Sequence, residues 1–188
     1  MADGDLGIAL LGIARSAIAS ELGRAARGAT SHPALAQPGA TFVTLKCDGE
    51  LRGCIGSLEP RRALGVDVRD NALAAAFRDP RFPPLAAAEL DATRVEVSLL
   101  SPREALVVAD EADLVRKLRP GVDGVVLECG HHRATFLPQV WETLGEPSEF
   151  LAALKRKAGL GAEFWSARMR VSRYRVTQWS ETTLPVAD

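Results

Sequence analysis

Apolar residues recur every three or four positions near the start of the chain. Leu6, Leu10, Ile13 and Ile18 therefore fall on one side of a helix, and Arg15 falls mainly on the other side. This spacing predicts an amphipathic helix of roughly five turns, which packs one apolar stripe against the core.

A β-hairpin is predicted next, because the dipeptide Asp48-Gly49 separates two apolar runs. If the loop contains only these two residues, Val43 lies opposite Cys54. A slip of one residue would reverse the facing of every side chain. Further along, Val95, Val97 and Leu99 alternate with polar residues, which predicts a strand with one buried face.

A second helix is predicted over residues 68–77, between the hairpin and the alternating strand. Asp67 resembles its N-cap, and Asp70 resembles a first-turn acid that favours the helix dipole. Three prolines in residues 79–85 then stop the helix and leave this segment few conformations. We expect Phe82 to be buried there and Arg81 to reach towards Cys54.

The second half of the chain mixes short helices and strands. Its patterns predict helices over residues 110–118 and from residue 147 to about Gly159, with a hairpin over residues 123–137. A last strand over residues 169–179 shifts its apolar phase, which indicates a bulge near Ser172 or Arg173. Without regular βαβ alternation, the class is α+β with largely antiparallel sheets.

Composition narrows the function classes. The 188 residues are 47% hydrophobic and 25% charged, with a net charge of -1, which is typical of a globular protein and argues against a uniformly basic surface for nucleic acid. No apolar run approaches the ~20 residues that a bilayer span needs. Three cysteines without a secretory signal fit a reducing compartment, so we expect a cytoplasmic protein.

Candidate chemistry gathers in Leu51-Arg52-Gly53-Cys54-Ile55-Gly56-Ser57-Leu58-Glu59-Pro60. Glycines have no Cβ, so those on either side of the Ile–Cys pair let a ligand approach the thiol closely. Cys54 is a nucleophile or covalent carrier if Arg52 or Arg81 stabilises its thiolate. The alternative is a small hydrophobe packed in a strand. No histidine lies in a recognisable partner motif for a Cys–His pair.

Several of these motifs, taken in order, resemble the AMMECR domain family, known in microbes as protein A of the AmmeMemoRadiSam system. Arg52-Gly53-Cys54-Ile55-Gly56 and Asp79-Pro80-Arg81-Phe82-Pro83-Pro84 are the most specific matches. Ser57 stands where the family pattern leads us to expect threonine. The other matching segments are Phe42-Val43-Thr44-Leu45, Glu96-Val97-Ser98, Gly121-Val122-Asp123-Gly124, residues 135–142 and Lys157-Ala158-Gly159-Leu160.

The resemblance implies a two-lobed α+β fold with mostly antiparallel sheets flanked by helices. It implies one domain over residues 5–182 with a tail over residues 183–188, and a cleft between the lobes lined by the glycine–cysteine stretch. It also implies two partners, a Memo-like protein and a radical SAM enzyme. The reaction itself is not implied, because the family has no settled one.

Two function classes follow. In the first, the chain is an enzyme or enzyme component that acts on a small molecule or peptide, with Cys54 as the reactive thiol and Glu59 as an acid or base. In the second, it is a non-catalytic binding module that docks a partner protein or nucleic acid. The predicted substrate-binding residues are Arg52, Gly53, Gly56, Ser57 and Arg81.

No cofactor or metal is expected. His131 and His132 lie near Cys129, but adjacent turn residues point apart and the spacing matches no metal motif. A locally basic segment over residues 155–175 contains seven lysines and arginines with aromatic residues nearby, and could bind an anion such as RNA. A solvated face with structural aromatic residues explains the same pattern.

Overall fold

The computed structural model describes residues 2–25 and 31–181, with side chains from Gly4 onward, so the predicted tail and part of the loop before Pro33 lie outside the described residues. The chain divides into two compact units. Unit 1 contains Met1–Leu100 and Thr177–Asp188, and unit 2 contains Ser101–Val176. Both are built from antiparallel sheets and helices, which confirms the predicted α+β class.

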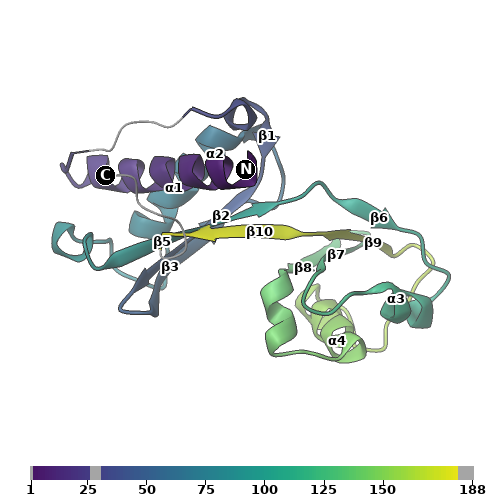
Figure 1. The fold of residues 1–188 in the computed structure, drawn as a ribbon. Helices are drawn as coiled ribbons and strands as arrows, with labels where there is room; N and C mark the ends of the chain where they lie inside the picture. The colour runs from purple at the N-terminus through teal and green to yellow at the C-terminus, as the bar shows by residue number, and fades with distance from the viewer. Residues whose placement is uncertain (1, 26–30, 182–188) are drawn as a thin grey trace. The chain divides into compact units, whose positions relative to one another are not determined.

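Unit 1 is a two-layer structure of helices on a sheet. Its four-stranded sheet has the order β10 (Val176–Ser180), β5 (Thr93–Leu100), β2 (Thr41–Cys47) and β3 (Glu50–Gly56), so β3 is an edge strand. The helices α1 (Ala2–Glu21) and α2 (Leu64–Phe77) lie on one side of this sheet, as Figure 1 shows. Buried residues of α1, including Leu10 and Ile18, pack with Val43 and Val95 of the sheet, as the apolar periodicity predicts.

The hairpin between β2 and β3 turns at Asp48 and Gly49, and this confirms the predicted loop. Both residues have positive φ, 51° and 86°, as the tight turn of a two-residue hairpin requires. However, the register shifts between Leu45 and Lys46, because Arg52 is an extra residue on β3. Thr44 therefore lies opposite Cys54, and the predicted pairing of Val43 with Cys54 is wrong by one residue.

The start of α2 differs from the prediction. The helix begins at Leu64, and its N-cap position is Ala63, which has no side-chain oxygen to accept a hydrogen bond. Asp67 is therefore a buried residue inside the first turn and not the N-cap. The remaining elements of unit 1 are short: β1 (Pro38–Gly39) pairs with β4 (Arg62–Ala63), and η1 (Pro33–Ala36) and η2 (Ala87–Glu89) are single 3-10 turns.

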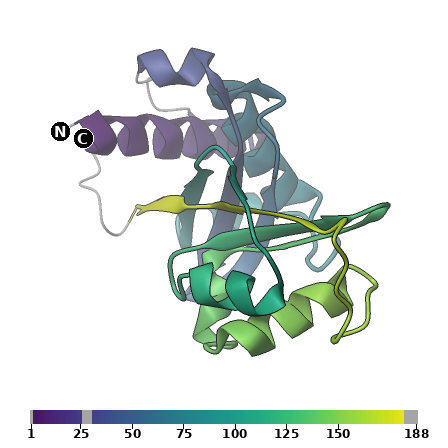
Figure 2. The same ribbon diagram turned by 90° about the vertical axis from the view of Figure 1, so that its right-hand side faces the viewer.

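Unit 2 has its own sheet and its own core. The strand order is β6 (Glu104–Leu106), β9 (Arg170–Tyr174), β7 (Gly124–Cys129) and β8 (His132–Phe136). The helices α3 (Glu111–Lys117) and α4 (Pro147–Lys157) lie side by side against it (Figure 2), and η3 (Pro138–Glu142) precedes α4. The core of this unit contains Leu114, Phe150, Leu151 and Leu154 together with residues of β7.

The C-terminal strand predicted over residues 169–179 is two strands. The pairing of β9 runs regularly through Ser172 and Arg173, so the bulge predicted there is wrong, and the break falls at Arg175. The chain returns to unit 1 at Thr177. In the part of the chain that the structure describes, every helix is too short or too polar to cross a membrane.

Candidate functional site

Cys54 lies on the edge strand β3 of unit 1 and is half-buried. Residues directly opposite in an antiparallel pair share one face of a sheet, so the Cys54 thiol lies on the face of Thr44. The core residues Val43 and Leu45 point to the other face. Thr44 Oγ1 lies 3.3 Å from Cys54 Sγ, at hydrogen-bond distance for sulfur.

Asp79, which follows α2, binds the backbone of Cys54. Its Oδ2 accepts the Cys54 backbone N–H at 2.9 Å, although 25 residues separate the two. The carboxylate accepts three further hydrogen bonds, all from Arg81: from Nη2 at 2.7 Å, from Nε at 2.9 Å and from the backbone N–H at 3.1 Å. Asp79 is thus a buried carboxylate with both oxygens occupied.

Electrostatics follow from these contacts. The Arg81 side chain, and then the backbone N–H groups of Cys54 and Arg81, hold the pKa of Asp79 well below its ordinary range, against burial, which raises that pKa. The hydrogen bonds to Asp79 raise the pKa of Arg81, and the Cys54 side chain contributes in the same direction. Near neutral pH the site therefore contains a carboxylate that is a poor base and a permanent cation beside the thiol.

Arg81 reaches Cys54 as the sequence predicts. Its Nη2 donates to the Cys54 backbone carbonyl at 3.1 Å, while just over half of its side chain, 53%, stays exposed. Phe82 is half-buried and not fully buried as expected, and the Arg81 guanidinium carbon lies 5.5 Å from its ring centroid. A ligand can therefore reach the outer edge of this cation.

Arg52 contacts the proline segment, residues 79–85, and is not the cation that contacts the Cys54 carbonyl. It pairs with Glu89 through Nε at 2.8 Å and Nη2 at 3.1 Å. It also donates to the carbonyls of Pro83 at 2.9 Å and Pro84 at 3.4 Å. These four contacts fix residues 83–89 against β3, so Arg52 holds in place the segment that presents Arg81.

Both glycines beside Cys54 allow close packing, and neither has a positive φ. A Cβ on Gly53 would lie 2.2 Å from the backbone oxygen of Ala75 in α2, and one on Gly56 would lie 2.3 Å from the Phe42 ring. The close approach of α2 and of the Phe42 ring therefore requires glycine at both positions. This requirement is structural, and their predicted contact with substrate stays a prediction.

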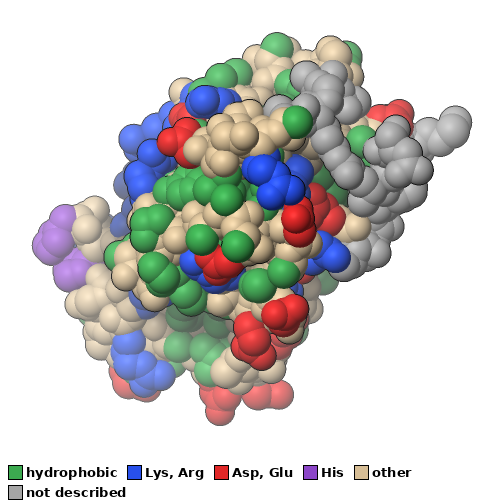
Figure 3. Space-filling model, turned by 90° about the vertical axis from the view of Figure 1, so that its left-hand side faces the viewer, with side chains coloured by type: hydrophobic (Ala, Val, Ile, Leu, Met, Phe, Trp, Pro, Cys, Tyr) green, Lys and Arg blue, Asp and Glu red, His purple; other side chains and the backbone are tan. Residues whose placement is uncertain are grey.

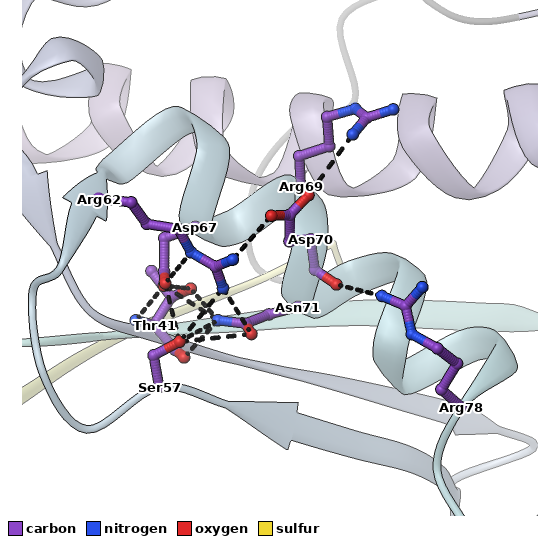
Figure 4. Close-up of polar contacts among 8 residues, drawn as sticks. All are labelled: Thr41, Ser57, Arg62, Asp67, Arg69, Asp70, Asn71 and Arg78. Carbon is purple, nitrogen blue, oxygen red and sulfur yellow. Dashed lines mark hydrogen bonds and ion pairs between the residues drawn. The ribbon is translucent and has the colours of Figure 1, made fainter.

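Ser57 belongs to a network of polar side chains at the other end of β3, shown in Figure 4. Its hydroxyl donates to Asp67 Oδ1 at 2.8 Å, and the same oxygen accepts Arg62 Nε at 2.9 Å. Asp67 Oδ2 accepts the backbone N–H and the hydroxyl of Thr41 and the amide of Asn71, at 2.7 to 2.9 Å. The network ties the exit of β3 to α2 and β2.

Glu59 follows β3 and pairs with Arg61. Its carboxylate accepts two hydrogen bonds from Arg61, from Nε at 2.9 Å and from Nη2 at 2.6 Å. The structure thus brings Cys54 together with Arg81, and it joins Glu59 to a neighbour in sequence. A proton-transfer role for Glu59 stays a prediction.

Two of the seven basic residues in the predicted segment pair with acidic side chains, whereas Arg156, Lys157, Arg168, Arg170 and Arg175 are exposed to solvent. Lys155 is fully buried and pairs with Glu111 at 2.8 Å, and Arg173 pairs with Glu104 at 2.8 Å. Tyr174 and Trp179 are buried, so neither ring is free to stack on a base. Side chains of both charge signs occur on the face shown in Figure 3. These contacts favour the solvated-face interpretation over RNA binding.

The metal interpretation gains no support in the described residues, where no group of three potential ligands gathers. His132 Nδ1 lies 2.9 Å from the Ala158 carbonyl, and His131 is exposed beside it. Cys129 is buried in β7, whereas Cys47 is half-buried at the hairpin end. Cys54 has the Thr44 hydroxyl at hydrogen-bond distance of its sulfur and Arg81 on its backbone carbonyl.

Sequence reasoning missed two residues of the site. Thr44 has no local signal, because only the register created by the Arg52 bulge sets it opposite Cys54. Asp79 belongs to a motif that the sequence singles out, but its buried position and its bond to Cys54 depend on the path of the proline segment. An aspartate between a helix and a proline could only have been flagged as a capping or turn residue.

Comparison with known proteins gives one consistent result. The AMMECR1 family pattern matches residues 11–179. The chain is 44% identical over 142 residues to a protein of Methanothermobacter thermautotrophicus, covering 74% of each chain. It is 40% identical over 144 residues to Protein MJ0810 of Methanocaldococcus jannaschii, covering 74% of this chain and 72% of that protein.

A solved structure agrees with these sequence matches. The crystal structure of the uncharacterized protein PH0010 from Pyrococcus horikoshii superposes with a TM-score of 0.81 at 32% identity, and the match covers 98% of this chain and 95% of that one. The α+β fold of this chain is therefore shared with a solved structure. The chain belongs to the AMMECR1 family.

Proposed function

We propose that this protein is an enzyme or enzyme component that acts on a small molecule or peptide, with Cys54 as its reactive thiol. The observation that carries the proposal is the contact of Arg81 with Cys54, since Arg81 is held there by three hydrogen bonds to Asp79. A cation fixed beside a thiol stabilises the thiolate, which is the nucleophilic form.

Each residue has a distinct role in this proposal. Arg81 stabilises the thiolate and offers its exposed edge to an anionic group of the substrate. Asp79 orients Arg81 and is not the base, because its depressed pKa makes it a weak proton acceptor. Arg52 fixes the segment that presents Arg81, and Glu59 is retained as the candidate acid or base.

The wider setting comes from the family resemblance. It supplies the Memo-like protein and the radical SAM enzyme as functional partners. Ser57, Gly53 and Gly56 are the proposed substrate contacts in the glycine–cysteine stretch. A nucleophile that forms a covalent intermediate fits a protein that passes a substrate to or from a partner enzyme.

The test compares two substitutions at Cys54 in a strain that lacks the protein. Cys54→Ser should abolish complementation, because a serine hydroxyl is a far poorer nucleophile than a thiolate at neutral pH. Cys54→Ala should abolish it as well, and Cys47→Ala should not. Thermal melts would check that each variant folds.

The rival class predicts a different pattern. If Cys54 is a packed residue of a binding module, a folded Cys54→Ala protein should complement the strain as well as the wild type does. That result would end the catalytic proposal. If both Cys54 variants instead fail to complement the strain, the substrate is sought next. Metabolite and peptide profiles of cells without this protein, compared with cells without the radical SAM partner, would identify it.

A further inference from the structure

The bulge at Arg52 determines which side chain meets the Cys54 thiol. With an uninterrupted register Cys54 would face Val43, an aliphatic core residue, whereas the observed register sets it opposite Thr44. A strand slip of one residue moves a side chain to the other face of a sheet. The extra residue on β3 therefore replaces an apolar neighbour of the thiol by a hydroxyl.

The Thr44 hydroxyl is directed to the sulfur. Its Oγ1 lies 3.3 Å from Cys54 Sγ, and in the described part of the chain this is its one side-chain hydrogen bond. The neighbour of Thr44 on the opposite strand is Glu96 of β5. The Glu96 carboxylate already accepts Lys46 Nζ at 2.9 Å and Gln178 Nε2 at 3.1 Å. Thr44 is thus engaged with Cys54 and not with the Glu96 carboxylate.

We propose that Thr44 is a positioning residue for Cys54, donating a hydrogen bond that stabilises the thiolate. This inference rests on the proposed function, in which Cys54 is the reactive thiol. Arg81 acts on the same residue from the loop that follows α2, whereas Thr44 acts from β2. The two groups belong to different segments, so their effects on the thiol can be separated by mutation.

The expected effect follows from the strength of hydrogen bonds to charged atoms. A donor binds an ionised acceptor about twice as strongly as a neutral one, so a hydroxyl beside sulfur favours the thiolate over the thiol. Loss of such a bond should reduce the rate of Cys54 alkylation at neutral pH about three- to tenfold.

The experiment measures the rate of Cys54 alkylation by iodoacetamide from pH 6 to about pH 10, with the modified peptide quantified by mass spectrometry. Thr44→Val removes the hydroxyl and keeps the side-chain shape, while Thr44→Ser keeps the hydroxyl. We expect the midpoint of the pH profile to rise in Thr44→Val and to stay near the wild-type value in Thr44→Ser. Thr177→Val, at an exposed threonine of β10, is the matched control.

The outcomes separate the inference from the proposal beneath it. If wild-type Cys54 reacts well ahead of Cys47 and Thr44→Val leaves the midpoint unchanged, Thr44 has no such role and the proposed function stands. If Thr44→Ser shifts the midpoint as much as Thr44→Val, the hydroxyl is not the cause and the inference is wrong. If wild-type Cys54 reacts no faster than Cys47, the proposed function and the inference fail together. Thr44→Ala serves as the second variant should Thr44→Val unfold.

Discussion

Asp79 and Cys54 are joined by a hydrogen bond of 2.9 Å from the Cys54 backbone N–H to the buried carboxylate. An edge strand normally presents unpaired N–H and C=O groups to solvent. At Cys54 both groups are occupied, the N–H by Asp79 and the carbonyl by Arg81. The proline segment therefore takes the place of a neighbouring strand at the residue that bears the thiol.

We predict that Asp79→Asn destabilises the fold by about 1–3 kcal/mol near neutral pH, because an amide cannot satisfy all four donors that the buried carboxylate accepts. The pKa of Asp79 is depressed in the folded state. Its stabilising effect is therefore complete above the unfolded pKa of about 3.9 and declines as the pH falls below that value towards the lower folded pKa.

Urea unfolding of both proteins between pH 7 and about pH 3 measures this effect. The stability difference should be constant near neutral pH and should shrink below about pH 4. Asp91→Asn is the control, since the Asp91 side chain is 78% exposed. A stability difference that stays the same down to pH 3 would show that the ionised Asp79 carboxylate is not responsible.

Gly53→Ala should cost about 1–3 kcal/mol, the usual penalty for added atoms in a packed site. Its new Cβ would lie 2.2 Å from the Ala75 backbone oxygen, and a helix backbone cannot move aside cheaply. Gly12→Ala is the matched control, because a Cβ at Gly12 meets no atom within 4 Å and alanine favours the helix interior. Thermal melts should show a lower Tm for the first variant and an equal or higher Tm for the second.

Asp67→Ala should destabilise the protein by about 3–5 kcal/mol, because it removes the buried partner of Arg62 and leaves the backbone N–H and the hydroxyl of Thr41 without their acceptor. Asp70→Ala removes a different partner of Arg62, one whose side chain is 35% exposed, and should cost at most about 1 kcal/mol. Denaturant melts of both variants make the comparison. Equal losses would mean that the network stabilises the fold only through its Arg62 ion pairs.

Arg52 and Glu89 should be energetically coupled, because their bidentate pair fixes the proline segment. Arg52→Ala and Glu89→Ala should each reduce stability, and the double variant should lose less than the sum by about 0.5–3 kcal/mol. Arg94 and Asp91 offer a control pair, since Arg94 donates to the backbone carbonyl of Asp91 and not to its side chain. If the stability losses of Arg52→Ala and Glu89→Ala were fully additive, the pair would not fix the proline segment.

The class of fold and many of the elements could be predicted because they depend on local patterns. The Asp48-Gly49 turn follows from positive φ at both residues, and α1 follows from its apolar stripe. The register beyond Arg52 could not be predicted, since a bulge changes pairing without a distinctive residue. Asp67 was misassigned because a buried carboxylate and a helix cap have the same sequence signal, an aspartate before an apolar run.

Part of the site could also be predicted, because it depends on a local sequence pattern. Arg81 was expected near Cys54, because three prolines restrict the path of its segment, and its contact with the Cys54 carbonyl agrees with that expectation. Arg52 is the alternative cation that the sequence offers for the thiol, and it is engaged by Glu89 across 37 residues of sequence. Such partners depend on tertiary packing, which periodicity and spacing do not encode.

The central claim is that Arg81 activates Cys54, and competitive alkylation of the native protein tests it most directly. A limiting amount of iodoacetamide at pH 7 should modify Cys54 well ahead of Cys47 and the buried Cys129. This preference should fall in Arg81→Gln and persist in Arg78→Gln, at an exposed arginine of the same region. Equal labelling of Cys54 and Cys47 in the folded wild-type protein would contradict the account.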